Sequence, residues 1–355
     1  MTDPTLLAEA RAAYTIVLFL SVDLSGSTAF KFSNDLADRK AGETDADPVH
    51  GWFSVIQKFY RHFNQSFLTR FNGEASTAQR PRLWKALGDE LIYMVEVTET
   101  QFVASTVRRF VDAVFATRHI VRDMSRSLDL KASAWLADFP ARNAIVDLNG
   151  LHDPLQEKPS AARRFSASAE YDYIGPSMDA GFRLGKLASR RKMPLSVELA
   201  YVLAEALSTN RTHGLIFGYE GRVELKGVLG GEDYPVLWLD VEDDRARCEA
   251  NENEASLLGR KRTVDVPDIR QFCPSFITSS PWMEPPFLKD EVAGPFVRLP
   301  RSVVDHMAAI SDRAQVENRL YDENAAVDVV IDDQTGARAD ETSDDLLSGV
   351  MPVSV

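Results

Sequence analysis

An apolar run that ends in a carboxylate is the feature that most constrains how this chain can fold. Residues 13–20 read AYTIVLFL, which predicts a buried β-strand, and Asp23 follows within SVDLSGSTAF, residues 21–30. Strand interiors disfavour Asp, so this carboxylate either caps the turn that follows or has a chemical role. A carboxylate beside a small turn with many free amides can hold a cation and a phosphate together. A second carboxylate nearby would favour the chemical role.

The composition narrows the class of protein. With 355 residues, of which 45% are hydrophobic, the chain can bury a sizeable core in one large domain or two ordinary ones. No apolar run is long enough to span a bilayer, and the N-terminus lacks the basic start and apolar centre of a signal peptide. We therefore expect a cytoplasmic protein with no membrane partner.

The net charge and the cysteine content argue against three further features: nucleic-acid binding, a disulfide framework and a zinc site. The formal net charge of −13 argues against non-specific binding of nucleic acid. A nucleoside triphosphate would need a local cationic site and metal ions. Cys248 and Cys273 lack CxxC spacing and a nearby histidine cluster, so they predict neither a disulfide framework nor a zinc site.

The periodicity predicts an α+β fold with one mainly antiparallel sheet and helices packed on it. After the first strand, residues 31–50 are polar and acidic and predict a loop. The further elements expected along the chain are a helix at 51–71, a hairpin at 82–97, a helix at 100–124, a strand at 130–140, a strand end with a Gly-Pro turn and a helix at 171–192, a short strand or turn and a helix at 195–207, and strands at 215–241.

The domain organisation predicted from these patterns has three parts. Residues 1–13 form an N-terminal segment, and residues 14–243 form the domain that carries the chemistry. Residues 244–355 comprise a charged linker, a segment rich in proline and aromatic residues, one helix and an acidic tail.

The second carboxylate is Asp89, in the expected hairpin turn after Gly88. A hairpin next to the first strand brings Asp89 close to Asp23. Two acidic groups at neighbouring strand ends suit two divalent ions, which lie about 3.5–4 Å apart in two-metal phosphoryl transfer. An ordinary Gly-Asp turn explains Asp89 equally well on its own, but it does not explain the pairing.

Four motifs in order resemble the class III nucleotidyl cyclases. They are VDLSGST at residues 22–28, KALGDEL at 85–91, YDYIGPSMDAGFRL at 171–184 and VELKGV at 223–228. Together the matches cover about residues 14–243. The resemblance implies a cyclase catalytic domain with a ferredoxin-like core, followed by a C-terminal extension.

The resemblance also implies roles for residues of all four motifs. Asp23, Asp89 and the Leu24 carbonyl would bind two divalent ions, Mn²⁺ or Mg²⁺. Arg183 would stabilise charge on the transferring phosphoryl group, and Lys226 would bind phosphate. Without the family, Arg183 is typical of a solvated helix face and Lys226 of a protected sheet edge. The turn that would present amides to the triphosphate consists of Ser25, Gly26, Ser27 and Thr28.

Two departures from the family pattern point to a subfamily. Asp179 stands where the family has Asn, and Phe182 is bulkier than the residue usual before the arginine. An extra carboxylate beside triphosphate is repulsive unless it is protonated, turned away, or bonded to Arg183 or to the sugar of the substrate. The forms DxGFR and KALGDEL resemble the uridylate and cytidylate cyclases of bacterial Pycsar anti-phage systems. In that subfamily a cyclic pyrimidine nucleotide activates a separate effector protein, with no direct contact to the cyclase expected.

The residues expected to read the base leave its identity open. Lys85 and Asp172 occupy positions at which adenylate cyclases of this class read adenine, and the same pair can hold the carbonyls and N–H of uracil. Tyr60 could fill the space that a smaller base leaves, although a core aromatic in the Phe53–Phe71 stripe is the simpler interpretation.

The reaction implied by the resemblance is UTP to 3′,5′-cyclic UMP and pyrophosphate, in a homodimer whose two active sites are shared between the chains. The alternatives are a cytidylate cyclase, an ordinary adenylate or guanylate cyclase, and a degenerate cyclase domain that senses nucleotide without turnover.

Overall fold

The computed structural model describes residues 3–40, 51–73, 79–148, 171–210, 214–259 and 263–313. The chain divides into two compact units, Met1–Val304 and Asp305–Val355, and the fold described here is that of the first. Its main sheet has eight strands in the order β10-β8-β9-β7-β4-β1-β3-β2, and β5 and β6 form a separate pair. The strands are β1 Thr15–Ser25, β2 Arg82–Leu87, β3 Glu90–Glu96, β4 Asp129–Phe139, β5 Ala144–Asp147, β6 Tyr171–Ile174, β7 Lys192–Leu195, β8 Phe217–Glu224, β9 Asp233–Asp240 and β10 Thr263–Val264.

Helices separate most of these strands along the chain. The α-helices are α1 Pro4–Ala13, α2 Ser27–Lys40, α3 Gly51–Leu68, α4 Thr100–Met124, α5 Pro176–Gly185, α6 Val197–Thr209, α7 Arg245–Leu257 and α8 Val266–Ser279. The long helices α3 and α4 carry apolar residues at three- and four-residue spacings, as the sequence predicts. None of the described helices is long and apolar enough to cross a membrane.

The first half of the sheet has a ferredoxin-like topology. Strands β1 to β4 stand in the order β4-β1-β3-β2, with helices in both the β1–β2 and the β3–β4 connection. Strand β1 is central and pairs antiparallel with β3 on one side and with β4 on the other. The expected α+β class, mainly antiparallel sheet and ferredoxin-like core are confirmed.

The second half of the chain extends this sheet beyond β4. Strand β7 joins β4 in parallel through Ala134 and Leu195, and β9, β8 and β10 follow with antiparallel pairing. Helix α6 contacts α4, β4 and β9, and α8 packs against α6. Strands and helices from beyond residue 190 are thus continuous with the ferredoxin-like core.

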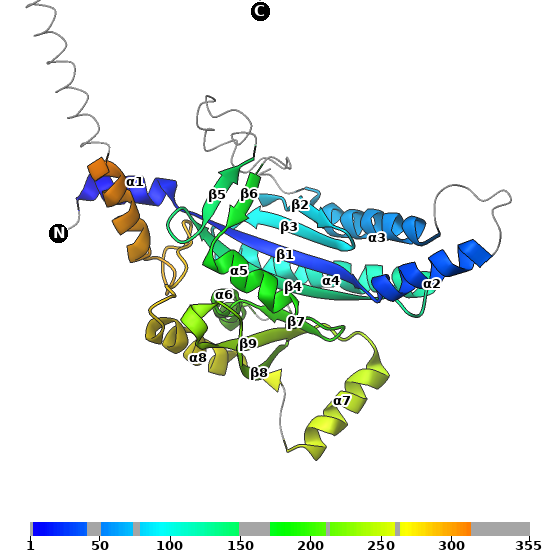
Figure 1. The fold of residues 1–355 in the computed structure, drawn as a ribbon. Helices are drawn as coiled ribbons and strands as arrows, with labels where there is room; N and C mark the ends of the chain where they lie inside the picture. Colours follow the sequence, from blue (N-terminus) through cyan, green and yellow to red (C-terminus); the bar gives the residue numbers. More distant parts are fainter. Residues whose placement is uncertain are drawn as a thin grey trace, which may run out of the picture. The chain divides into compact units, whose positions relative to one another are not determined.

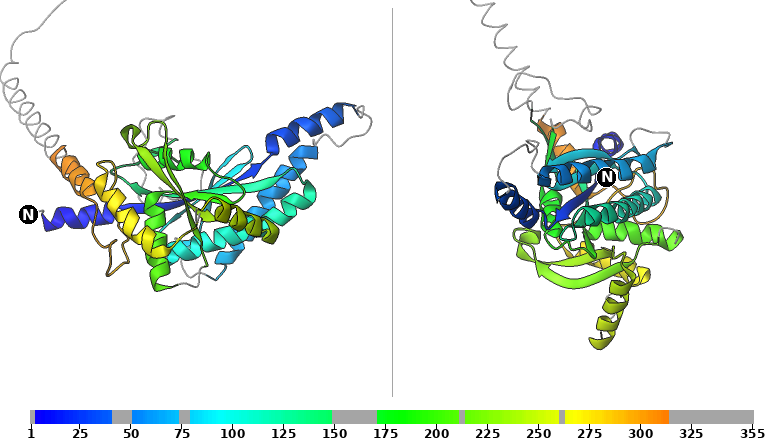
Figure 2. Two further views of the ribbon diagram at one scale, coloured as in Figure 1. Left: turned by 90° about the horizontal axis from the view of Figure 1, so that it is seen from below. Right: turned by 90° about the vertical axis from the view of Figure 1, so that its right-hand side faces the viewer.

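The two faces of the sheet are covered differently. On one face, Phe63 and Phe67 of α3 contact Tyr93 of β3 and Phe110 of α4, with ring centroids 5.2–5.8 Å apart. On the other face the β5–β6 ribbon and α5 cover an aromatic cluster that includes Phe19 and Trp135, and both elements lie in front of the sheet in Figure 1. Figure 2 shows the same layers from two further sides.

Three local expectations differ from the structure. Residues 31–40, expected to be loop, belong to α2, and the expected linker after residue 243 contains α7. In α7 the Asp244 side chain caps the first turn, so a mostly polar sequence still forms a helix. Strand β5 has only four residues and gave no separate signal. Of the expected helix at 302–320, residues 302–313 are helical; the rest of it, residues 41–50 and the acidic tail lie outside the described residues.

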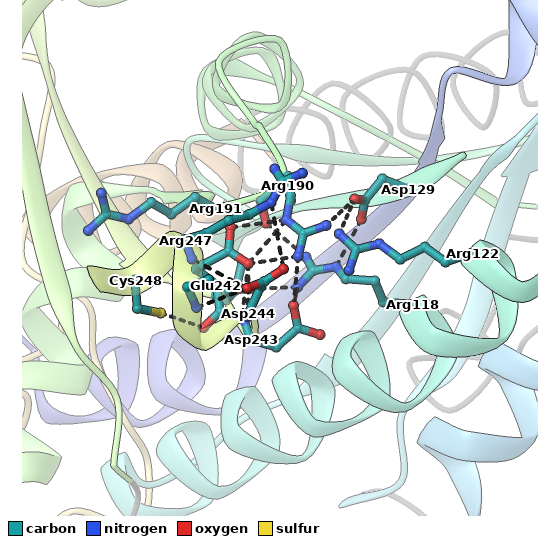
Figure 3. Close-up of polar contacts among 12 residues, drawn as sticks. Arg118, Arg122, Asp129, Arg190, Arg191, Glu242, Asp243, Asp244, Arg247 and Cys248 are labelled. Atoms are coloured by element: carbon teal, nitrogen blue, oxygen red, sulfur yellow. Dashed lines mark hydrogen bonds and ion pairs between the residues drawn. The ribbon is translucent and has the colours of Figure 1, made fainter. Parts of the chain in front are cut away.

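A buried arginine joins distant parts of this unit. Arg118 of α4 is 0% exposed, and its Nε lies 3.0 Å from Asp129 Oδ1 at the start of β4. Its Nη1 donates to the Val241 carbonyl after β9, at 2.7 Å, and lies 3.1 Å from Asp243 Oδ1. Arg190 lies in the same cluster, between Asp129 at 2.6 Å and Glu242 at 2.7 Å (Figure 3). Helix α4, β4 and the end of β9 are thereby fixed to one another.

We expect Arg118→Met to lower the free energy of unfolding by about 3–5 kcal/mol, because it removes a fully buried charge from a network with Asp129 and Asp243 and takes the Arg118 donors from the carbonyls of Val241, Leu130 and Arg190. Arg126→Met, at an exposed arginine just beyond the same helix, should change it by less than about 0.5 kcal/mol. Urea unfolding followed by circular dichroism measures both. Equal stability of the two variants would contradict a structural role for the cluster.

Candidate active site

Asp23 lies near the end of β1, flanked by a carboxylate and an ammonium group. In the sheet register its neighbours are Glu90 of β3 and Lys131 of β4. Lys131 Nζ lies 2.8 Å from Asp23 Oδ2, and the aspartate side chain is 22% exposed. Burial raises the pKa of Asp23; the ion pair with Lys131 opposes this rise and the charge of Asp89 adds to it.

Asp89 occupies the β2–β3 turn and is held against the end of β1. Gly88 precedes it with φ 69°, which fits the first position of a type II′ hairpin turn. The Ser27 hydroxyl donates to Asp89 Oδ2, and the Leu24 N–H donates to the Asp89 carbonyl at 3.1 Å. The two carboxylates that the sequence singled out therefore lie in one place, at the meeting of β1 and the hairpin.

The turn after Asp23 leads directly into a helix. Gly26 has φ 84°, and a Cβ built on it would lie 2.4 Å from the Ser127 carbonyl oxygen, so only glycine fits there. Helix α2 begins at Ser27, and the first N–H groups of a helix have no partner within it. An anion is favoured at such a helix start. The site can therefore receive phosphate next to the two carboxylates.

Tyr60 of α3 belongs to this region. Its hydroxyl donates to the Gly88 carbonyl, so its ring lies against the hairpin turn, and its side chain is only partly buried. Burial raises the pKa of Tyr60 and the charge of Asp89 adds to the rise. Its contact is with the turn that carries Asp89, and a role toward a base stays a prediction.

Two residues of this region were not singled out from the sequence. Glu90 accepts a 2.5 Å hydrogen bond from Ser21, and burial raises its pKa while that bond lowers it. Glu90, Asp23 and Lys131 line one cavity of about 260 Å³, together with Phe182 of α5. Glu90 adjoins Asp89 in the sequence, which was an available signal. Lys131 is found only through the pairing of β1 with β4, which the sequence does not reveal.

The expected base-reading pair forms an ion pair. Lys85 Nζ lies 2.6 Å from Asp172 Oδ1, although the two residues are far apart in sequence, and both side chains are about one-third exposed. The indole N–H of Trp84 donates to the Tyr171 carbonyl at 3.1 Å, which ties β2 to β6 and aligns the pair.

Helix α5 presents the residues of the third motif. Asp179 and Phe182 are exposed, and the Phe182 ring lies 5.5 Å from that of Trp135 and 6.4 Å from that of Trp84. Arg183 has a buried Nε without a hydrogen-bond partner in the described part of the chain. Its Nη2 lies 3.9 Å from a Cβ built on Gly227, beside the exposed Lys226 that follows β8. Arg183 and Lys226 therefore lie in one neighbourhood.

The donor set near Asp23 suits a hard cation. Its groups are the carboxylates of Asp23 and Asp89 and the carbonyl of Leu24, all oxygen donors of the kind that Mg²⁺ and Mn²⁺ accept. The raised pKa of Asp23 shows a carboxylate that burial and a like charge disfavour, and a cation would relieve both. Among the described residues no group of three or more His, Cys, Asp or Glu side chains is arranged as a metal site, so any ion would keep several water ligands.

Comparison with known proteins gives a weak likeness. No family model matches the chain, and no curated protein matches it at a significant level. The adenylyl cyclase CyaB from P. aeruginosa is similar in structure, with 11% identity over 65% of this chain and 96% of that chain and a TM-score of 0.42. The guanylyl cyclase Cya2 has 13% identity over 64% of this chain and 91% of that chain, with a TM-score of 0.39. An adenylate cyclase from Trypanosoma brucei has 12% identity over 65% of this chain and 90% of that chain, with a TM-score of 0.38. These values are too low to assign a family or an activity.

Lys131 should weaken metal binding, because its ammonium group already neutralises Asp23. We expect Lys131→Gln to bind Mn²⁺ about threefold to tenfold more tightly than the wild type, and Asp23→Asn to lose the site. Electron paramagnetic resonance of free Mn²⁺ measures both without any substrate. Lys58→Gln, at an exposed lysine of α3, is the matched control. Unchanged affinity in both Lys131→Gln and Asp23→Asn would place the metal elsewhere.

Proposed function

We propose that the chain is a class III nucleotidyl cyclase that converts UTP to 3′,5′-cyclic UMP and pyrophosphate. The observation that carries the proposal is the convergence of Asp23 and Asp89 beside the helix start at Ser27, at one end of a ferredoxin-like sheet. Two carboxylates and a set of free amides at one place suit a metal-bound triphosphate.

The residues of the chain would position the substrate and neutralise its charge. The turn Ser25–Thr28 would receive the β- and γ-phosphates, and Arg183 with Lys226 would neutralise the transferring group. When bound, divalent ions would lower the pKa of the ribose 3′-hydroxyl and steady the triphosphate. The Nε of Arg183 has no hydrogen-bond partner among the described residues, so this guanidinium keeps hydrogen-bonding capacity that a phosphate oxygen could use after the side chain turns.

The base preference rests on the side chains around Lys85. The ion pair between Lys85 and Asp172 offers donors and an acceptor that suit the edge of uracil. The Phe182 ring lies 6.4 Å from that of Trp84, which precedes Lys85, and we expect its bulk to favour a smaller base over a purine. Asp179 is exposed on the same helix and can accept a hydrogen bond from the sugar.

A shared site in a homodimer accounts for the distribution of these groups. Within one chain, no hydrogen bond or ion pair joins the described Arg183 or Lys226 to Asp23 or Asp89. We expect a second copy to complete an active site that needs all four groups, and two-fold symmetry would give two such sites. The cyclic nucleotide would act as a second messenger in anti-phage defence, through a separate effector.

Two alternatives remain open to experiment. A cytidylate, adenylate or guanylate cyclase would use the same carboxylates with another base. A nucleotide sensor without turnover would bind triphosphate at the same turn; the presence of Asp23, Asp89 and Arg183 together favours turnover.

With Mn²⁺ and all four ribonucleoside triphosphates, we expect cyclic UMP as the main product, with kcat/KM for UTP at least tenfold above that for ATP. One base contact can supply the roughly 1.4 kcal/mol that this ratio needs. Chromatography with mass detection identifies the product. Asp23→Ala and Asp89→Ala should make none while staying folded, whereas Lys58→Gln should match the wild type. Preference for ATP would overturn the base assignment, and easily measurable product from a folded Asp23→Ala variant would overturn the two-metal assignment.

Asp89→Ala and Arg183→Ala should each be inactive alone and recover activity when mixed. After random subunit exchange about half of the dimers are mixed, and each mixed dimer has one site with both lesions and one with neither. Activity should therefore approach about a quarter of that of the wild type, measured as pyrophosphate release. No recovery despite exchange shown by differently tagged subunits would mean that each site lies within one chain.

A further inference from the structure

A second cavity lies away from the Asp23 carboxylate. It has a volume of about 320 Å³ and is enclosed by the starts of α5 and α6, the glycine-rich turn after β8 and the segment that follows α8. This size lies at the lower end of the range of small-molecule sites, about 300–1,000 Å³. None of its lining residues has a role in the proposed cyclisation.

The polar part of the cavity lining includes Arg142, whose side chain is 15% exposed and lies between two buried carboxylates. Arg142 Nη1 lies 4.0 Å from Asp138 Oδ1 and 4.0 Å from Glu198 Oε1. Well-formed arginine–carboxylate bonds are about 2.7–2.9 Å long, so the guanidinium is near both acids without a hydrogen bond to either. Across the described chain no other acceptor lies within hydrogen-bond distance of it. Arg142 and Glu198 both line the cavity.

The opposite side of the cavity is apolar. Trp282 lies over Gly230, where a built Cβ would be 2.9 Å from the indole ring. Met283, Val228, Leu229 and Ala180 of α5 also line the cavity. Trp282 is 55% exposed, so its ring lies between the cavity and solvent without sealing the cavity.

We propose that this cavity binds a small neutral molecule that has an amide-like edge and a planar apolar ring. Arg142 offers only donors. Burial raises the pKa of Glu198, while the charge of Arg142 opposes this rise and favours the ionised form, which offers only acceptors. A ligand group that accepts from Arg142 and donates to Glu198 at adjacent positions satisfies both, as a primary amide or a lactam does. An anionic ligand would be repelled by the Glu198 carboxylate. A cationic amidinium would offer no acceptor to Arg142, so the arginine would stay unpaired. The ring would lie against Trp282 and Met283.

The position of the cavity gives binding a route to the candidate active site. The glycine-rich turn that lines it includes Gly227, which lies beside Arg183 and follows Lys226. A ligand against this turn would restrict it. The binding proposal itself does not depend on cyclase activity and is tested by binding alone.

Three probes that share a phenyl ring and differ in their polar group test which hydrogen-bonding pattern the cavity accepts. They are benzamide, which donates and accepts, benzoate, which only accepts, and benzamidine, which only donates. Saturation-transfer NMR and calorimetry on the full-length protein should give benzamide a dissociation constant on the order of 1 mM, typical for so small a ligand. Benzoate and benzamidine should bind at least fivefold more weakly. Glu198→Gln should bring benzoate to within twofold of benzamide, because the repelling carboxylate is gone.

Two variants of the walls test the location. Ala180→Leu fills the cavity and should abolish benzamide binding, and Trp282→Ala removes the cover and should weaken it at least threefold. The control Ala8→Leu, at an exposed alanine of α1, should leave benzamide binding unchanged. Thermal melting shows whether each variant is folded. If Ala180→Leu does not fold, Trp282→Ala alone tests the location. The proposal is overturned if benzamide shows no binding at a concentration tenfold above about 1 mM. It is also overturned if the folded wall variants bind benzamide as tightly as the wild type does, or if the wild type binds benzoate as tightly as benzamide.

Discussion

The structure depends on the pairing of β1 with two antiparallel neighbours. Residues 15–25 pair with β4 along the whole strand and with β3 along most of it. Because side chains alternate across a sheet, Val17, Phe19, Ser21 and Asp23 share one face. The first two belong to the aromatic core and the last two line the candidate active site. A one-residue slip would move all four to the other face, so packing of the core also fixes the place of the carboxylate.

The sequence predicts the parts of the site that local chemistry determines. The strand before Asp23, the glycine turn before Asp89 and the helix that carries Arg183 all follow from patterns a few residues long. Lys131 could not be predicted, because its contact with Asp23 depends on a strand register set by packing across the whole sheet. Helices α2 and α7 were missed for another reason: both have mostly polar sequences, and α7 buries no side chain at all.

Two clusters of buried charge in this unit use similar residues in different ways. Around Arg118 and Arg190, carboxylates and carbonyls lie at 2.6–3.3 Å from the guanidinium nitrogens, and these contacts hold α4, β4 and the end of β9 together (Figure 3). Around Arg142 the nearest carboxylate atoms are at 4.0 Å and a cavity adjoins them. The short contacts around Arg118 and Arg190 make that cluster rigid, whereas the longer distances around Arg142 leave its guanidinium able to form hydrogen bonds with a further molecule.

The contact between Gly181 and Trp135 controls the depth of the candidate active site. A Cβ built on Gly181 would lie 2.3 Å from Trp135 Cδ2, so the helix lies as close to the sheet as a backbone can come. Asp23 and Lys131 belong to the sheet, whereas Phe182, which lines the same cavity, belongs to helix α5. A methyl group at position 181 would push Phe182 away from Asp23 and Lys131. The size of the side chain at position 181 therefore sets the spacing between α5 and the sheet, and with it the width of the cavity that Asp23 lines.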